Sequence, residues 1–235
     1  MFGKYYEENL RAVSSAKPSL WINSQSDITG DLNQLECYLY IDIEDNEYAT
    51  DYFLLAHASA QASGYSVNGL PIWHISGISG AIKGFGEVIY SSLMIELGKQ
   101  GAVLVSDRQA ITADAEKIHL KLQASDNVQN NYLTATHPLH TNLETELDRN
   151  PDYPISHINT AYKLNPSKKV LSMHDVMMKS HDSRNLDEKK LAYLKEEGQY
   201  LAEWIIMNCD ETDTYLSNGF KDLLPAKAVD CALSI

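Results

Sequence analysis

A glycine-rich stretch in the first half of the chain has the composition of an anion-binding turn. GISGAIKGFG, residues 77–86, holds four glycines, and an apolar, helix-like run follows it. Such a turn points successive backbone N–H groups at one place, where the dipole of the following helix favours negative charge. Because Gly84 and Gly86 have no Cβ atom, a phosphate could approach the backbone closely. No Gly-Lys-Ser/Thr follows, so the turn is not a Walker motif.

Two side chains just before this turn are placed for proton transfer. Alternation along a strand puts His74 and Ser76 on one face and Trp73 and Ile75 on the other. His74 is the first candidate for a general base, because the unperturbed pKa of an imidazole lies near neutrality. A hydrogen-bonded, purely structural histidine is the alternative interpretation.

Further titratable side chains could take part in the same chemistry. Asp42 and Glu44 share one face of an earlier strand, where they could act as a base or attract a cationic amine. An exposed strand face without a function is the alternative for this pair. Tyr90 and His119 are candidate acids. We expect no catalytic triad from the scattered histidines.

The elements that must position these residues follow a mixed α/β pattern. Aromatic and β-branched residues predict four strands, and apolar periodicity predicts helices around and after them. The strands cover residues 19–25, 35–43, 52–59 and 71–79; a helix over 3–16 precedes them, and a helix over 85–98, a strand over 101–106 and a helix over 113–123 follow.

After about residue 125 the chain becomes polar and rich in turns. We therefore predict a core over residues 1–125 and a polar connection with a helical C-terminal extension over 126–235. Ser172 and Asp175 resemble a capping box at the start of one helix in this extension. A second helix carries an apolar stripe that should dock on the core, formed by Leu191, Leu194, Leu201 and Ile205.

Composition excludes several classes of function. The net charge of −13 disfavours binding to nucleic acid or to an anionic membrane and favours cationic partners, although a DNA mimic is a further possibility. No apolar run is long enough to span a membrane, and the N-terminus has no signal-like segment. The three cysteines show neither metal-binding nor disulfide spacing. We expect a cytoplasmic protein without a metal ion.

Two known families have a glycine-rich turn of this kind. GAIKGFG, residues 80–86, resembles the turn of short-chain dehydrogenases, and Asp107 follows it at about the 20-residue spacing of their ribose-binding acid. However, that fold usually begins with the turn, whereas here several strand-like segments precede it. The chain also has no Tyr-x-x-x-Lys, the catalytic pair of that family.

The order of elements resembles the GNAT superfamily of acyl-CoA-dependent N-acyltransferases more closely. There the fourth strand leads into a pyrophosphate-binding Gln/Arg-x-x-Gly-x-Gly/Ala turn, to which AIKGFG, residues 81–86, is similar. Residues 35–125 also resemble a GNAT-like group that is common in tailed phages. The motifs that carry this resemblance are Gly84-Phe85-Gly86, Val88-Ile89-Tyr90, Ser106-Asp107-Arg108 and Asp114-Ala115.

The resemblance implies a GNAT-type mixed sheet flanked by helices and transfer of an acetyl group from acetyl-CoA to a small-molecule or protein amine. It implies His74, Ser76, Glu44, Tyr90 and His119 as catalytic candidates. The cofactor would lie against Ile75, Ile82, Lys83, Gly84, Phe85 and Gly86, so a glutamate at position 86 should obstruct it. We expect Asp107 and Arg108 to form a local ion pair or turn.

One departure from the superfamily pattern leaves a second function open. Ala81 stands where the superfamily prefers Gln or Arg, which removes one side-chain contact to the pyrophosphate. The alternative is a GNAT-fold phage protein without catalysis that binds or inhibits a host or phage protein, or belongs to the virion. A homodimer is compatible with either function.

Overall fold

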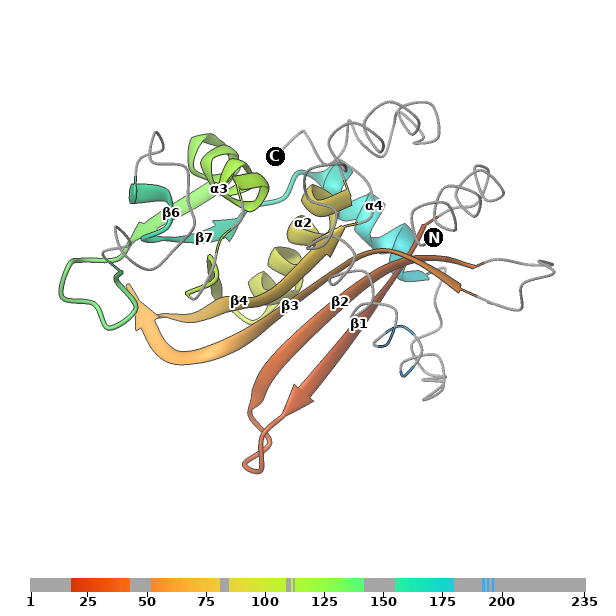
Figure 1. Cartoon of the computed structure of the whole chain (residues 1–235), viewed down its shortest axis with the longest axis horizontal. Coiled ribbons are helices and arrows are strands. Elements are labelled where there is room, and N and C mark those ends of the chain that lie inside the picture. Colours follow the sequence, from red (N-terminus) through yellow and green to blue (C-terminus); the bar gives the residue numbers. More distant parts are fainter. Residues whose placement is uncertain are drawn as a thin grey trace.

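Four consecutive segments form an antiparallel meander in this computed structural model of the chain (Figure 1). They are β1 (Ser19–Ser26), β2 (Leu32–Asp42), β3 (Tyr52–Val67) and β4 (Leu70–Gly80). Each overlaps a strand predicted from the sequence. β3 continues well past the predicted end at residue 59, because its pairing with β4 runs almost to the turn at residues 68–69.

The structure describes most of the first 179 residues and three positions beyond them. The described residues are 18–42, 52–80, 85–108, 111, 113–141 and 155–179, together with Ala192, Leu194 and Glu196. The helix predicted over 3–16 therefore lies outside the described residues.

Three shorter strands complete a seven-stranded mixed sheet in the order β1-β2-β3-β4-β5-β7-β6. β5 (Val103–Val105) runs parallel to β4, and β7 (Thr160–Leu164) pairs antiparallel with both β5 and β6 (Val128–Tyr132). β6 and β7 lie in the segment for which the sequence predicted a polar connection. The sheet therefore continues beyond residue 125.

Three helices lie on one face of the sheet (Figure 1), namely α2 (Phe85–Lys99), α3 (Ala113–Ala124) and α4 (Lys168–Lys179). α2 is the central helix, because Tyr90 contacts His119 of α3 while Glu96 binds His174 of α4. α2 packs against β3. Three fully buried alanines at alternate positions of β3 belong to the same core cluster as the buried residues of α2. Their small side chains let the helix approach the sheet closely; they are Ala56, Ala58 and Ala60.

The start of α4 differs from the predicted capping box. The helix begins at Lys168, and Ser167 caps it, because the backbone N–H of Val170 donates to Ser167 Oγ at 3.3 Å. Ser172 and Asp175 lie inside the helix, so the capping box predicted there is wrong. Ser167 follows a proline, and serine is among the residues preferred at a helix N-cap.

The main core lies between α2 and the sheet and extends to the C-terminal part of the chain. Leu194 is fully buried in it, in agreement with the predicted docking of the apolar stripe. Leu191, Leu201 and Ile205 lie outside the described residues. No helix among the described residues combines the length and the apolar character that crossing a bilayer requires.

Candidate functional site

β4 pairs with β5 over only three residues. The parallel ladder joins Ile72 to Val103, Trp73 to Leu104 and His74 to Val105. β4 then continues for six further residues, to Gly80, while β5 ends. Within the described part of the chain, no strand pairs with this edge of β4 beyond His74. Among the described residues, no further strand uses the backbone groups along this edge, and such groups can bind a ligand that forms strand-like hydrogen bonds.

A β-bulge lies where this free edge begins. Ala60 faces Ile75 and Ser59 faces Gly77, so Ser76 is an extra residue on β4. The exposed Ser76 hydroxyl donates to Ser59 Oγ at 2.9 Å. A Cβ atom at Gly77 would lie 3.1 Å from Ser59 Oγ, so a larger residue there would require the Ser59 side chain to shift. Bulges of this kind re-aim side chains and end strand pairing, and they occur often near active sites.

His74 lies beside the bulge, on the face of the sheet opposite α2. It pairs with Gln61, whereas the neighbouring Ile75 faces Ala60 in the core under α2. Burial lowers the pKa of His74; the nearby charge of Asp107 opposes this effect and that of Arg108 adds to it. The imidazole is therefore neutral near pH 7 and able to accept a proton. Its buried Nδ1 atom has no hydrogen-bond partner among the described residues.

The N-terminus of α2 follows the glycine-rich turn directly. Phe85 lies in the core, with only 5% of its surface exposed. A Cβ atom at Gly86 would point toward α3, 3.7 Å from Ile118 Cδ1. The expectation that a glutamate at 86 would obstruct a bound anion stays a prediction, because residues 81–84 of the turn lie outside the described residues. Glu87 in the first turn forms an ion pair with Lys121 of α3.

The other residues of the turn and one candidate acidic residue, Glu44, belong to the part of the chain that the structure does not describe. Ala81, Ile82, Lys83, Gly84 and Glu44 lie outside the described residues. Asp42 ends β2, but the position of its side chain is not described. Their predicted roles stay predictions.

Tyr90 and His119, the two candidate acids, form a buried pair. Tyr90 Oη lies 3.4 Å from His119 Nε2, and the His119 ring also lies 5.5 Å from the Tyr162 ring. Burial, with smaller effects of His157 and Arg108, lowers the pKa of His119 to about 3. Burial also raises the pKa of Tyr90. Both side chains are thus neutral near pH 7 and closed off from solvent, which favours a structural role.

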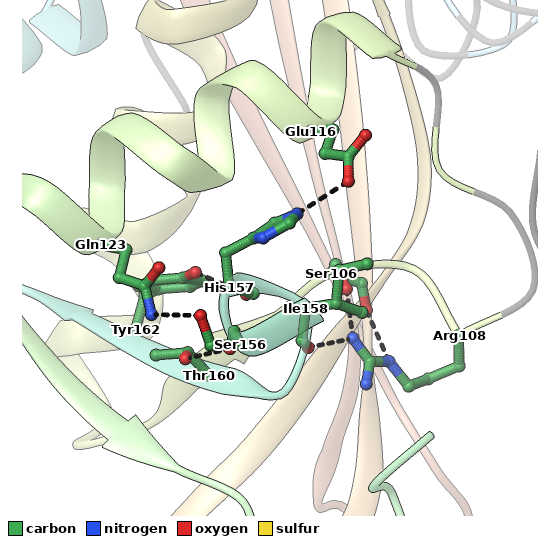
Figure 2. Close-up of polar contacts among 9 residues, drawn as sticks. All are labelled: Ser106, Arg108, Glu116, Gln123, Ser156, His157, Ile158, Thr160 and Tyr162. Carbon is green, nitrogen blue, oxygen red and sulfur yellow. Dashed lines mark hydrogen bonds and ion pairs between the residues drawn. The ribbon is translucent and has the colours of Figure 1, made fainter. Parts of the chain in front are cut away.

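A second buried pair joins α3 to η1 (Ile155–His157), a short 3₁₀ helix (Figure 2). His157 Nε2 lies 3.0 Å from Glu116 Oε1, and neither side chain is exposed to solvent. Tyr162 Oη donates to the His157 carbonyl at 2.5 Å. Nothing in the sequence pattern pointed to this network, because its members are far apart along the chain.

Arg108 binds three segments around the end of β5, and Figure 2 shows its contacts with Ser106 and Ile158. Its Nε donates to the Ser106 carbonyl at 3.1 Å, Nη1 to the Leu139 carbonyl at 3.1 Å and Nη2 to the Ile158 carbonyl at 2.7 Å, besides a contact with Ser106 Oγ. Burial lowers the pKa of Arg108 to about 10, and the charge of Asp107 opposes that shift. Arg108 remains charged near neutral pH and holds the Ser106–Arg108 segment in place.

The described residues contain no group of three or more side chains that could hold a metal ion. Searches against protein-family models, curated proteins and solved structures find no match to this chain. The geometry of the site must therefore carry the functional argument alone.

Proposed function

We propose that this chain is a GNAT-type, acyl-CoA-dependent N-acyltransferase that transfers an acetyl group from acetyl-CoA to an amine. The acceptor is a small-molecule or protein amine, and the net charge of −13 favours a cationic one. The proposal assigns His74 as the general base and the free edge of β4 as the place of the acyl donor.

The observation that carries the proposal is that β4 continues for six residues past the end of the parallel strand β5. β4 leaves the ladder with β5 after His74, at a bulge, and six residues of its edge then lack a partner strand among the described elements. The amide groups of a pantetheine chain can pair with such an edge as a further strand would. The same strand leads into the glycine-rich turn and α2, whose N-terminus favours a pyrophosphate.

The described residues offer this donor several hydrogen-bonding groups and one unfavourable charge, the carboxylate of Glu87. The β4 edge offers backbone hydrogen bonds, and Ser79 has a buried hydroxyl without a hydrogen-bond partner among the described residues. The carboxylate of Glu87 near the helix N-terminus would repel a pyrophosphate, but its ion pair with Lys121 offsets that charge. The backbone of the turn, with Lys83, would hold the pyrophosphate.

His74 would act on the amine rather than on the donor. When bound, acetyl-CoA supplies an activated acetyl group: the amine nitrogen bonds to the carbonyl carbon, and the carbon–sulfur bond breaks. The amine must lose a proton to attack, and the neutral His74 imidazole accepts it. The exposed Ser76 hydroxyl on the same face can orient the amine by a hydrogen bond. Tyr90 and His119 are buried, so neither side chain would protonate the leaving thiolate, whose proton would come from solvent.

Acetyl-CoA binding and acetyl transfer test the proposal in two steps. We expect acetyl-CoA to raise the melting temperature by mass action, whereas NAD should not. His74→Gln should bind acetyl-CoA as the unmodified chain does but lower kcat by about 10²-fold or more. No thermal shift with acetyl-CoA would reject the proposal, and a shift with NAD alone would favour the dehydrogenase interpretation.

The burial of Tyr90 and His119 favours one alternative. Without an exposed acid on the described residues of the site, the fold could serve as a binding, inhibitory or virion-associated protein that does not catalyse transfer. A stable protein partner combined with no affinity for acetyl-CoA would favour this alternative.

A further inference from the structure

We propose that Asp107, just past the end of β5, is a positioning residue whose carboxylate stabilises the positively charged His74 imidazolium during transfer. This inference rests on the proposed function, because it assigns Asp107 a part in the reaction that His74 carries out. From the sequence alone, Asp107 was expected only to form a local ion pair or turn with Arg108.

The strand register brings the two residues to the same place. His74 pairs with Val105 in the last rung of the β4–β5 ladder, and Asp107 follows two residues later. Val105 packs with Ile72, which lies two residues before His74, so these side chains share the face opposite α2. Asp107 lies just past the end of β5, two residues after the partner of His74 in the last rung. Asp107 is half-buried, whereas Ser106 before it is completely buried.

The backbone of Asp107 is fixed on both sides. Ser106 accepts hydrogen bonds from Arg108 through its carbonyl and its hydroxyl. Arg108 is anchored in turn to the carbonyls of Leu139 and Ile158. A carboxylate carried by such a segment cannot move far from its neighbours, and this preorganisation is what a positioning residue requires.

Among the described residues, Asp107 and Arg108 are the charged groups that shift the pKa of His74, and of these two Asp107 is the anion. The field of Asp107 raises the pKa of His74 against burial, and the field of Arg108 lowers it. Across the ladder, on β3, His74 faces Gln61, which does not titrate. The segment beside Arg108 carries His137 and His140, of which His137 is bound to Ser66 and Leu139.

The role follows from the movement of one proton. His74 is neutral before the reaction and becomes an imidazolium when it accepts the proton of the amine. The Asp107 carboxylate stabilises that positive charge without taking the proton itself. The imidazolium then releases the proton to solvent, so His74 returns to its neutral form and no other reagent is consumed.

The first test follows His74 directly and requires no ligand. NMR titration of the His74 ring, assigned with the His74→Gln variant, would be compared between the unmodified chain and Asp107→Asn. We expect the pKa of His74 to fall in Asp107→Asn and to be preserved in Asp107→Glu. Asp126→Asn removes the same charge from the exposed turn after α3 and should leave His74 unchanged. An unchanged pKa in Asp107→Asn overturns the inference.

The second test follows the reaction, with acetyl-CoA and spermidine as substrates. Asp107→Asn should lower kcat by about tenfold, less than loss of the base itself. It should also move the acidic limb of the kcat/KM profile to lower pH, a change that mere structural damage would not produce. If Asp107→Asn lowers the rate but leaves the acidic limb of the kcat/KM profile at the same pH, the positioning role is overturned. If His74 titrates as expected but acetyl-CoA does not bind, the proposed function fails and the catalytic role of Asp107 fails with it.

Discussion

The Ser76 hydroxyl donates a 2.9 Å hydrogen bond to the Ser59 hydroxyl where β4 holds one more residue than β3. Ser59 is buried and Ser76 is exposed, so the bond ties the accessible extra residue to the interior of the sheet. The bulge is therefore positioned by β3 and not by β5, whose pairing with β4 ends at His74. The bulge follows His74, whose own face is set by its pairing with Gln61 and Val105.

We predict that Gly77→Ala destabilises the chain through Ser59. The new Cβ atom would lie 3.1 Å from Ser59 Oγ, and this overlap should cost about 1–3 kcal/mol of unfolding free energy. Urea denaturation measures the change. Ser59→Ala removes the opposing oxygen, so Gly77→Ala should cost less in that background than alone. Equal costs in both backgrounds would show that the bulge is not set by this contact.

A second prediction concerns the charge before α2. Lys83 precedes the first residue of the helix by two positions. Lys83→Glu should weaken acetyl-CoA binding by about tenfold or more, because a hydrogen bond to a charged group contributes about 1.5–3 kcal/mol. Calorimetric titration measures the affinity. Lys168→Glu makes the same charge change at the N-terminus of α4 and should not alter it. Equal affinities in all three proteins would exclude Lys83 from the donor site.

The sequence predicted the strands and helices around the site better than the contacts within it. β1 to β4, α2 and α3 are encoded by local apolar patterns, and each overlaps its predicted segment, although β3 continues well past the predicted end at residue 59. β6 was missed because its segment, VQNNY, is mostly polar and joins the sheet only through β7. The bulge at Ser76 and the Arg108 clamp depend on pairing between distant segments, which local patterns cannot reveal.

Acid pH should loosen the contact between α2 and α4. Burial would raise the pKa of Glu96, but hydrogen bonds from His174 and Lys99 outweigh it, so the net pKa lies below the ordinary value of 4.5. The ionised carboxylate therefore stabilises the fold above about pH 4.5, and this contribution is lost as pH falls through the lowered pKa. Glu96→Gln should flatten the acidic decline in unfolding free energy. An unchanged decline would assign acid sensitivity to other carboxylates.

The Glu116–His157 pair should be far more sensitive to the loss of one partner than to the loss of charge. Both side chains are fully buried at 3.0 Å from each other. His157→Ala removes that partner from a buried carboxylate and should cost about 3–5 kcal/mol. Glu116→Gln keeps an oxygen that can accept the same hydrogen bond and should cost less. Thermal and urea unfolding compare the two variants; similar losses in both would contradict this account.

Leu194 should hold the C-terminal part of the chain on the core. Its side chain is completely buried in the main cluster, although it lies about 30 residues beyond the last strand of the sheet. Leu194→Ala should therefore cost about 2–5 kcal/mol of unfolding free energy. Glu196→Ala, at an exposed position two residues away, should change it by no more than about 0.5 kcal/mol. Deleting residues 184–235 should cause aggregation or a loss of stability at least as large as that of Leu194→Ala. A soluble, monomeric and equally stable truncation would mean that the segment contributes no binding energy to the core, and would favour its use as a docking element for another protein.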